Sequence, residues 1–204
     1  LAKIEQSIVS FYRKEGFFET TANAACNNSN YYCRNLSLTI KEGPRSYISE
    51  IVIEGDKIPD QIASSVLPKK TKDLPATEKF AHKLRNSLIK ALRGEGYISA
   101  RIESSYVDQL GIKDKQLVIS VATDKPVTFI FNGNSKFTAE QFLKTINLFK
   151  RKQPFGANTI NILLENMERK YREAGYLYTS ITYRRDIDLK TNRVYYVIDI
   201  HEES

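Results

Sequence analysis

Three short segments, each at the end of a helical pattern, decide the fold of this chain: Tyr12-Arg13-Lys14-Glu15-Gly16-Phe17, Leu92-Arg93-Gly94-Glu95-Gly96-Tyr97 and Tyr171-Arg172-Glu173-Ala174-Gly175-Tyr176. A glycine after a helix can adopt the left-handed backbone of a C-terminal cap, which strains any residue that has a Cβ atom. The three glycines, at positions 16, 96 and 175, are separated by 80 and 79 residues. This spacing predicts a structural repeat.

Two other landmarks recur with nearly the same period. A strand-like run that ends in glycine occurs at Ile51-Val52-Ile53-Glu54-Gly55 and again at Phe129-Ile130-Phe131-Asn132-Gly133. A polar segment with a final proline occurs at Lys41-Glu42-Gly43-Pro44 and again at Thr123-Asp124-Lys125-Pro126. Because three kinds of landmark agree on one period, the chain is expected to consist of repeated units of about 80 residues.

The hydrophobic pattern changes at the glycines. Before each glycine, apolar residues recur every three or four positions, which is typical of one face of an amphipathic helix. After Gly96 and Gly175, apolar and polar residues alternate, as in a half-buried strand. In the last copy the helical face consists of Ile160, Leu163, Leu164, Met167, Tyr171 and Ala174, and the alternating apolar positions are Leu177, Thr179, Ile181 and Tyr183.

Each complete copy has the element order strand, short helix, long helix, strand, strand. The short helix of the last copy begins at Thr138, where Gln141 would complete a capping box. The last strands, residues 117–121 and 194–200, are apolar at successive positions, which is typical of a central strand. We therefore expect an α+β fold of three-stranded mixed sheets, each covered by two helices, with the third strand between the first and the second.

The repeat divides the chain into three parts. Residues 46–125 and 126–204 are each expected to form a complete β-α-α-β-β module, and residues 1–45 a partial module with only the second helix and the last two strands. About 80 residues are enough for a hydrophobic core. Short segments that contain proline join the parts, which favours semi-rigid joints.

This element order and period resemble the POTRA (polypeptide-transport-associated) domain, which stands in tandem before the membrane barrel of BamA-like and TamA-like proteins. The strongest local matches are Phe131-Asn132-Gly133-Asn134-Ser135-Lys136-Phe137-Thr138 and Tyr171-Arg172-Glu173-Ala174-Gly175-Tyr176-Leu177, and the resemblance covers residues 46–204. It implies a periplasmic module, the soluble part of an outer-membrane protein that assembles barrels or secretes polypeptides. The partners it implies are unfolded outer-membrane or secreted polypeptides, accessory assembly proteins and a C-terminal membrane β-barrel in the parent chain.

The resemblance also implies a binding mode. In the family, the strand after the second helix lies at a sheet edge, where an extended polypeptide can pair with it through backbone hydrogen bonds, a mode called β-augmentation. The matching strands here are Ile98–Tyr106 and Leu177–Arg184. The candidate polypeptide-binding residues are Ile98, Ser99, Ala100, Arg101, Ile102, Glu103, Tyr178, Thr179, Ser180, Ile181 and Thr182. The alternative is that these edges are only solvated and that binding occurs in grooves between modules.

Cys26 and Cys33 are the two cysteines of the chain, and no second pair of Cys or His lies nearby to complete a zinc site. The residues Asn27-Asn28-Ser29-Asn30 predict a turn between two strands, which would bring the two sulfur atoms together. In an oxidising compartment we expect a disulfide there. The alternative is two unrelated buried thiols, and such a cysteine pair is not a general feature of POTRA domains.

The sequence contains no recognisable arrangement of catalytic residues. His82 and His201 are the only histidines, and neither stands in a Ser-His-Asp or Cys-His arrangement. The Gly-x-Gly at Gly94 and Gly96 ends a helix, so it cannot cradle a phosphate at a helix N-terminus. No run of apolar residues approaches the roughly 18 needed to span a bilayer. We therefore expect no enzyme activity, no metal site and no cofactor.

The formal net charge of +7 supports an alternative function. Two basic segments, Lys69-Lys70-Thr71-Lys72 and Lys150-Arg151-Lys152-Gln153, lie between predicted helices, and a basic surface suits nucleic acid, anionic membranes or acidic polypeptides. The same element order occurs within KH domains, whose Gly-x-x-Gly loop clamps a nucleic-acid backbone. Neither interhelical segment contains that motif. We therefore expect no nucleic-acid partner and a possible contact with a membrane surface. The alternative function is a module that binds nucleic acid or an anionic surface through these basic interhelical loops.

Overall fold

The computed structural model describes residues 1–27, 33, 35–145 and 157–203. These residues form two compact units, the first of residues 1–88 and 102–121 and the second of residues 89–101 and 122–204. The predicted division into parts 1–45, 46–125 and 126–204 does not coincide with these units, and it stays a prediction. Each unit is described by itself below.

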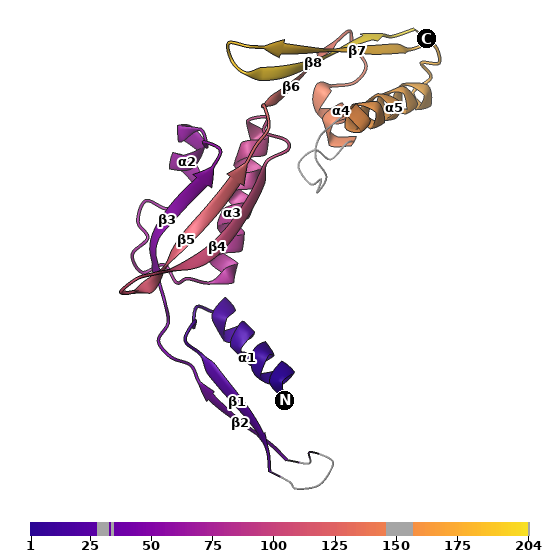
Figure 1. Cartoon of the computed structure of the whole chain (residues 1–204). Helices are drawn as coiled ribbons and strands as arrows, with labels where there is room; N and C mark the ends of the chain where they lie inside the picture. The colour runs from indigo at the N-terminus through magenta and orange to yellow at the C-terminus, as the bar shows by residue number, and fades with distance from the viewer. Residues whose placement is uncertain (28–32, 34, 146–156, 204) are drawn as a thin grey trace. The chain divides into compact units, whose positions relative to one another are not determined.

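The first unit begins with a helix on a small sheet. Helix α1 (Ala2–Lys14) precedes strands β1 (Thr21–Cys26) and β2 (Leu36–Lys41), which pair antiparallel. The Glu5 carboxylate accepts a hydrogen bond of 2.7 Å from the backbone N–H of Ala24 in β1. This bond fixes α1 alongside the two-stranded sheet, as Figure 1 shows.

The first unit also contains a three-stranded sheet. Its elements are β3 (Ile48–Gly55), α2 (Asp60–Val66), α3 (Glu78–Gly94, of which residues 78–88 belong to this unit), β4 (Arg101–Gln109) and β5 (Ile112–Ala122). The strand order is β3-β5-β4, and β3 runs parallel to β5. Leu117 and Ile119 of β5 are fully buried. The predicted central position of the third strand is therefore confirmed, because its apolar residues are covered in the middle of the sheet.

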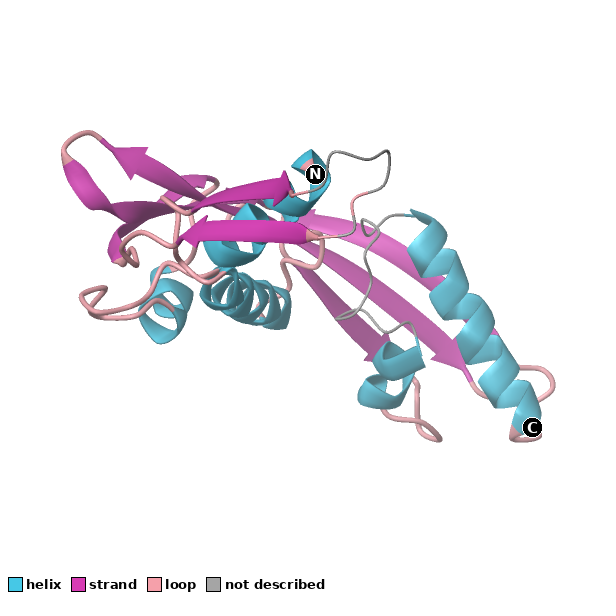
Figure 2. Ribbon diagram, turned by 90° about the horizontal axis from the view of Figure 1, so that it is seen from below, coloured by secondary structure: helices cyan, strands magenta, loops and turns pink. Residues whose placement is uncertain are grey.

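The second unit repeats this arrangement. Its elements are β6 (Val127–Asn132), α4 (Ala139–Thr145), α5 (Ala157–Glu173), β7 (Ser180–Asp188) and β8 (Arg193–His201). The order is β6-β8-β7, with β6 parallel and β7 antiparallel to β8, so the sheet is mixed as predicted. Helices α4 and α5 both lie on one side of the sheet in Figure 1. Figure 2 shows its three strands side by side, near the C-terminus.

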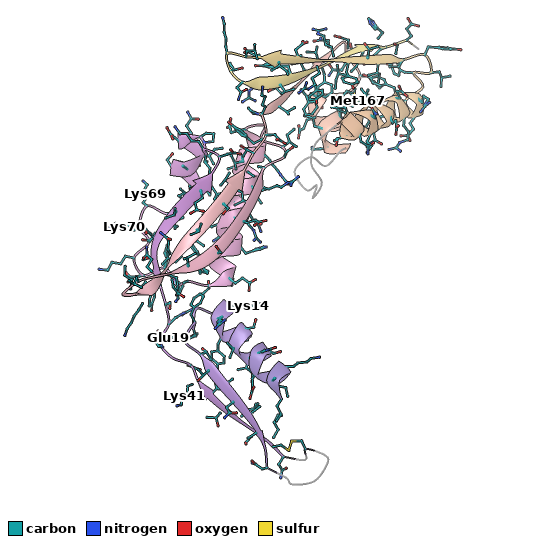
Figure 3. The ribbon with its side chains drawn as sticks, viewed as in Figure 1. Lys14, Glu19, Lys41, Lys69, Lys70 and Met167 are labelled. Atoms are coloured by element: carbon teal, nitrogen blue, oxygen red, sulfur yellow. A yellow bond between two sulfur atoms is a disulfide. The ribbon has the colours of Figure 1, made fainter. Side chains whose placement is uncertain are left out.

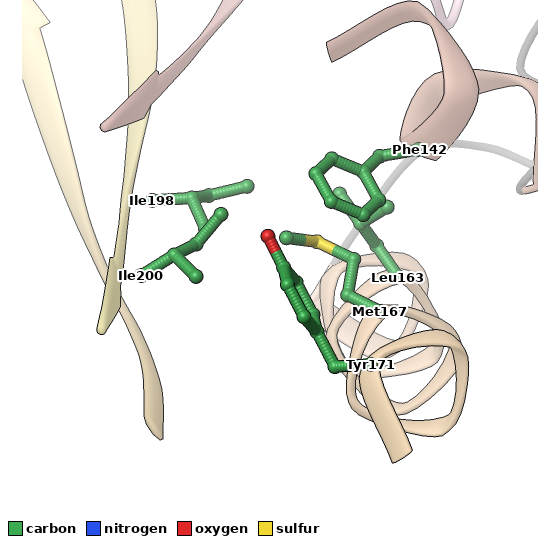
Figure 4. Close-up of a cluster of buried hydrophobic side chains, with 6 residues drawn as sticks. All are labelled: Phe142, Leu163, Met167, Tyr171, Ile198 and Ile200. Carbon is green, nitrogen blue, oxygen red and sulfur yellow. The ribbon is translucent and has the colours of Figure 1, made fainter. Parts of the chain in front are cut away.

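The core of the second unit joins the two helices to the central strand. Leu163, Met167 and Tyr171 are spaced by four residues along α5 and are fully buried. They meet Ile198 and Ile200 of β8 and Phe142 of α4, as Figure 4 shows. Full burial of one such side chain contributes about 1.5–3 kcal/mol. This cluster therefore fixes which face of the β6-β8-β7 sheet the helices cover.

The predicted helix ends are confirmed. Gly16, Gly96 and Gly175 have φ values of 97°, 95° and 90°. In the capping box, the Thr138 N–H donates to Gln141 Oε1 at 2.9 Å, and the Gln141 N–H donates to Thr138 Oγ1 at 3.3 Å. Local capping chemistry thus decides where these helices begin and end.

A disulfide joins Cys26 at the end of β1 to Cys33. Their Cα atoms lie 5.7 Å apart, and the sulfur–sulfur bond is drawn in yellow in Figure 3. The expected turn between the two cysteines lies mostly outside the described residues. The bond links two residues that are seven positions apart in the sequence, at the end of the sheet where β1 finishes.

Candidate functional site

Strands β4 and β7 lie at the edges of the two three-stranded sheets. Within the described parts of the chain, β4 pairs only with β5, and β7 pairs only with β8. An edge strand presents backbone N–H and C=O groups that have no partner in the sheet. The candidate residues Arg101, Ile102 and Glu103 lie in β4, and Ser180, Ile181 and Thr182 lie in β7.

The other five candidate residues precede these strands, which corrects the predicted strand limits. Strand β4 begins at Arg101 and β7 at Ser180, so Ile98, Ser99, Ala100, Tyr178 and Thr179 are not strand residues. The chain turns first, because it must leave the direction of the helix. The Ala100 N–H donates to the Tyr97 carbonyl at 3.1 Å, and the Thr179 hydroxyl donates to the Tyr176 carbonyl at 3.3 Å.

The two faces of β7 differ in chemistry. Ile181 lies directly across from Ile200, and Tyr183 lies across from Ile198, so both belong to the face that the helices cover. Arg184 lies across from Val197 on the opposite face, and its guanidinium contacts the Asp186 and Asp199 carboxylates at 3.2 Å each. Charges on an edge strand oppose uncontrolled pairing with other edges.

Sequence reasoning missed the second half of β7 as part of the site. Tyr183 is 40% exposed and Ile187 is 41% exposed, although both lie on the helix-covered face. The Tyr183 ring packs on the Tyr196 ring with centroids 6.3 Å apart. In the sequence, Ile187 returns to the phase of Ile181 and Tyr183, but Arg185 interrupts the alternation between them. The exposed side chains of this face are therefore two apolar groups, Tyr183 and Ile187, on either side of the exposed Arg185.

Strand β4 is anchored from within its unit. Ile102 is buried, while Arg101 and Glu103 are exposed. The Tyr106 hydroxyl donates a hydrogen bond of 2.8 Å to the Thr77 carbonyl, just before α3, and burial raises the pKa of Tyr106 far above its ordinary value. The partly buried phenol therefore connects β4 to the start of α3 through a hydrogen bond.

The first strands are also edge strands, but the edge of β3 is partly covered. The Ile48 N–H donates to the Leu74 carbonyl at 2.8 Å, and the Thr71 hydroxyl donates to the Ser49 carbonyl at 3.0 Å. Tyr47 and Pro75 form an isolated antiparallel bridge. The loop between α2 and α3 therefore already occupies the beginning of this edge, whereas no corresponding loop is described beside β4 or β7.

The basic loop between α2 and α3 is solvent-exposed. Lys69, Lys70 and Lys72 are exposed, and the first two are labelled in Figure 3. None of the three forms a salt bridge with another described residue. The second predicted basic segment, Lys150 to Gln153, lies outside the described residues.

The described residues do not assemble a metal or catalytic centre. No group of three His, Cys, Asp or Glu side chains among them is placed to hold a metal ion. His82 is exposed on α3, where its ring lies 3.2 Å from the Asn86 side-chain amide. None of the helices, as far as they are described, has the length and apolar character needed to cross a bilayer.

Comparison with known proteins gives remote structural neighbours. The chain aligns with domains POTRA3-5 of BamA from Haemophilus influenzae at 17% identity and a TM-score of 0.41, over 98% of this chain and 80% of that one. It aligns with domains POTRA1-3 of Omp85 from Anabaena at 14% identity and a TM-score of 0.44, over 100% and 82%. CdiB from Escherichia coli matches at 14% identity and a TM-score of 0.35, over 99% and 34%. No curated protein is similar enough to match.

A family match covers most of the sequence. The POTRA family, described as surface antigen variable number repeat, matches residues 46–124 and again residues 128–203. Modules of this family are non-enzymatic, periplasmic parts of outer-membrane proteins that serve outer-membrane protein assembly or secretion. They bind polypeptide substrates and partner proteins in general. With two matched repeats of this length and with the sheet order found in both units, the chain belongs to the POTRA family.

Proposed function

We propose that this chain is a polypeptide-binding part of an outer-membrane assembly or secretion protein, and that it holds extended clients by β-augmentation along β4 and β7. The observation that carries the proposal is the strand order: in each three-stranded sheet, the strand after the long helix has one neighbour among the described strands. A client strand would continue the sheet on the free side. Unfolded outer-membrane or secreted polypeptides are the proposed clients.

Backbone pairing explains how one edge serves many clients. The hydrogen bonds of an added strand use N–H and C=O groups that every residue except proline offers, so binding depends little on client sequence. Side chains of the client that point to the helix-covered side would meet Tyr183 and Ile187, which are both about two-fifths exposed. These two apolar groups, with Arg185 between them, favour clients whose apolar and polar residues alternate, as they do in strands of membrane barrels.

The affinity for one client strand is expected to be low. An extended peptide loses backbone and side-chain freedom when it is ordered, and a few backbone hydrogen bonds offset only part of that cost. The charges of Arg101, Glu103 and Arg184 also limit pairing at these edges. Weak, reversible binding suits a module that passes clients on.

A second candidate function is attachment to an anionic surface. The exposed Lys69, Lys70 and Lys72 and the net charge of +7 favour it. Binding of this kind weakens steeply with salt, because the charges are exposed and screened. Backbone pairing with a neutral peptide changes little with salt, so ionic strength separates the two candidates.

The direct experiment is an NMR titration of the 204-residue chain with a neutral peptide of about ten residues taken from a barrel strand, a length typical of such strands. We expect amide shifts along β4 and β7, retained when salt is raised from about 50 to about 300 mM, a range that shortens the screening length by roughly half. Shifts that cluster at Lys69–Lys72 and vanish with salt would contradict β-augmentation and favour the anionic-surface function.

A further inference from the structure

A cleft in the first unit opens between α1, α3 and β4. Its volume is about 690 Å³, within the range of roughly 300–1,000 Å³ that is typical of small-ligand sites. Its lining includes Val9 and Arg13 of α1, Ala81 and Arg85 of α3, and Ser104 and Tyr106 of β4. The cleft therefore has room for side chains of a bound molecule and offers them both apolar and charged groups.

The side of α1 that lines the cleft is polar. Gln6, Ser10 and Arg13 line the cleft and lie on one side of the helix. Ile4 and Phe11, which are exposed, lie on the opposite side. The wall that α1 provides therefore carries hydrogen-bonding groups, and the cleft is separate from the exposed apolar side chains of this helix.

Three contacts hold the walls of the cleft together. The Lys14 ammonium lies 3.5 Å from the Glu78 carboxylate at the start of α3. The Phe18 ring, which follows α1, packs edge-on against the Tyr106 ring of β4, with centroids 5.7 Å apart. The Tyr106 hydroxyl in turn donates to the Thr77 carbonyl just before α3. Each of the three elements is thus connected to another one at the cleft.

The cleft carries an excess of positive charge. The two carboxylates among its described lining residues, those of Glu5 and Glu78, already have partners, a backbone N–H of β1 and the Lys14 ammonium. Arg13 and Arg85 form no salt bridge with any residue that the structure describes. The first turn of α3, which carries partial positive charge, lines the same cleft. These charges complement an anionic group.

The cleft lies beside the free edge of β4. Ile102, Ser104 and Tyr106 alternate along one side of this strand, and the bond from Tyr106 to the start of α3 shows that this side faces the helix. A strand added on the free side of β4 would place its inward side chains about 5 Å from those of β4, on the same side of the sheet. Such side chains would project into the cleft, which Ser104 and Tyr106 line.

We propose that this cleft receives an acidic side chain of the client strand that pairs with β4, and that Arg13 and Arg85 bind its carboxylate. The inference rests on the pairing proposed above and names a class of client, a polypeptide with aspartate or glutamate among the side chains that face the helices. Charge-assisted hydrogen bonds from arginine to a carboxylate are stronger than neutral ones. An anionic lipid headgroup has the charge but no strand to pair with β4, so the free edge favours a polypeptide.

Two peptides of about ten residues, the length of a barrel strand, test the inference. Both alternate valine with serine and have acetylated and amidated ends, which removes the terminal charges. One has glutamate in place of a central valine, and the other has glutamine there. NMR titrations of the 204-residue chain give the dissociation constant of each peptide from the amide shifts of β4.

We expect the glutamate peptide to bind β4 about three- to fivefold more tightly than the glutamine peptide, near the upper range for a partly exposed pair of charges. The difference should shrink when salt is raised from about 50 to about 300 mM, because salt screens exposed charges. The double variant Arg13→Gln with Arg85→Gln should bring the two peptides to equal affinity. The matched control, Lys3→Gln with Lys83→Gln, removes the same charge from α1 and α3 at exposed positions outside the cleft and should keep the preference.

The possible failures of the inference are distinguishable. Equal affinity of the two peptides for β4 in the unchanged chain, or a preference that survives the arginine substitutions, would overturn the inference and leave the proposed pairing intact. Absence of shifts along both β4 and β7 with either peptide would overturn the pairing itself, and the inference with it. Vesicles of phosphatidylglycerol that shift the amides of Ala81–Arg85 and displace the glutamate peptide would overturn the inference in favour of a lipid headgroup.

Discussion

The hydroxyl group of Tyr171 donates a hydrogen bond of 2.6 Å to the Glu202 carboxylate, which connects the buried face of α5 to the segment after β8. Burial raises the pKa of Tyr171 far above its ordinary value, and the bond to Glu202 adds to that effect. Although burial opposes ionisation of Glu202, hydrogen bonds from the Lys136 N–H and from Tyr171 hold the pKa of Glu202 below its ordinary value.

This relationship predicts a pH dependence of stability. A carboxyl group whose pKa is lowered by folding stabilises the folded state above its unfolded pKa, here about 4.5, and loses that contribution as pH falls through the folded pKa. We expect Glu202→Gln to lower the unfolding midpoint in urea at pH 7 and to lower it progressively less below pH 4.5. A difference between the variant and the parent chain that is constant from pH 7 to pH 3 would contradict the account.

Tyr171→Phe tests the same bond from the helix side. The variant keeps the buried ring but leaves Glu202 without this donor, so we expect a loss of about 1–2 kcal/mol in the free energy of unfolding. The NMR signals of Ile198 and Ile200, which lie in the same cluster, report the unfolding of this unit. Tyr178→Phe is the matched control, because Tyr178 is 72% exposed and its loss of a hydroxyl should cost almost nothing.

A substitution at Met167 tests the hydrophobic core between the helices and the sheet of the second unit. The side chain is fully buried between α5 and β8, so Met167→Ala should reduce the free energy of unfolding by about 2–5 kcal/mol. Leu189→Ala removes a similar number of atoms from an 84% exposed side chain and should change stability by less than about 0.5 kcal/mol. Equal losses in urea unfolding would show that the cluster is not the core of this unit.

Alanine substitutions at Gly96 and Gly175 distinguish the cost of backbone strain from the cost of a close contact with the new Cβ atom. Both have positive φ, so alanine at either position costs about 1–2 kcal/mol. Only at Gly96 would the new Cβ also meet a neighbour, the Val127 carbonyl oxygen at 2.4 Å. We expect Gly96→Ala to lower the unfolding midpoint clearly more than Gly175→Ala does. Equal midpoints would mean that Val127 does not sit closely on Gly96.

The sequence predicted the parts of the fold that local chemistry decides. The glycines at positions 16, 96 and 175 marked the helix ends because only glycine adopts positive φ without strain. The central position of β8 was predictable because its residues are apolar on both faces, and Val197 and Ile198 are indeed both buried. These features need no knowledge of distant contacts.

Features that depend on tertiary packing could not be predicted in the same way. Alternation begins at Ile98 and at Leu177, but a turn and a strand can carry the same alternation, so each predicted strand began three residues too early. The hydrogen bonds that connect Thr71 and Leu74 to the edge of β3 join segments that are more than 20 residues apart in the sequence. The exposure of Ile187 depends on how far α5 extends over β7.

The disulfide predicts how many free thiols the oxidised protein contains. Denatured, unreduced protein from an oxidising compartment should contain no free thiol, because Cys26 and Cys33 are joined. On the chain-entropy model the short loop contributes about 2–3 kcal/mol, so reduction should loosen the two-stranded sheet of β1 and β2. A double Cys→Ser variant serves as the control for reduction. Two free thiols in the oxidised preparation would contradict the bond.

Proline substitution tests the role of the β7 backbone. Proline lacks the N–H group and distorts a strand, so Ser180→Pro or Ile181→Pro should weaken peptide binding at whichever position directs its N–H outward. Thr182→Ser changes only a side chain and should leave affinity within about twofold, since backbone pairing is largely indifferent to side chains. Titrations with one barrel-strand peptide give the comparison. Equal affinity for all three variants would contradict backbone pairing at this edge.

The central claim is that clients pair with the backbones of β4 and β7, and intermolecular nuclear Overhauser effects test it most directly. With a labelled chain and an unlabelled barrel-strand peptide, we predict contacts between peptide backbone protons and the backbone protons of Ser180–Asp188 or Arg101–Gln109, regularly spaced as in a sheet. Contacts confined to side chains of the basic loop at Lys69–Lys72, with none along either edge strand, would contradict the claim.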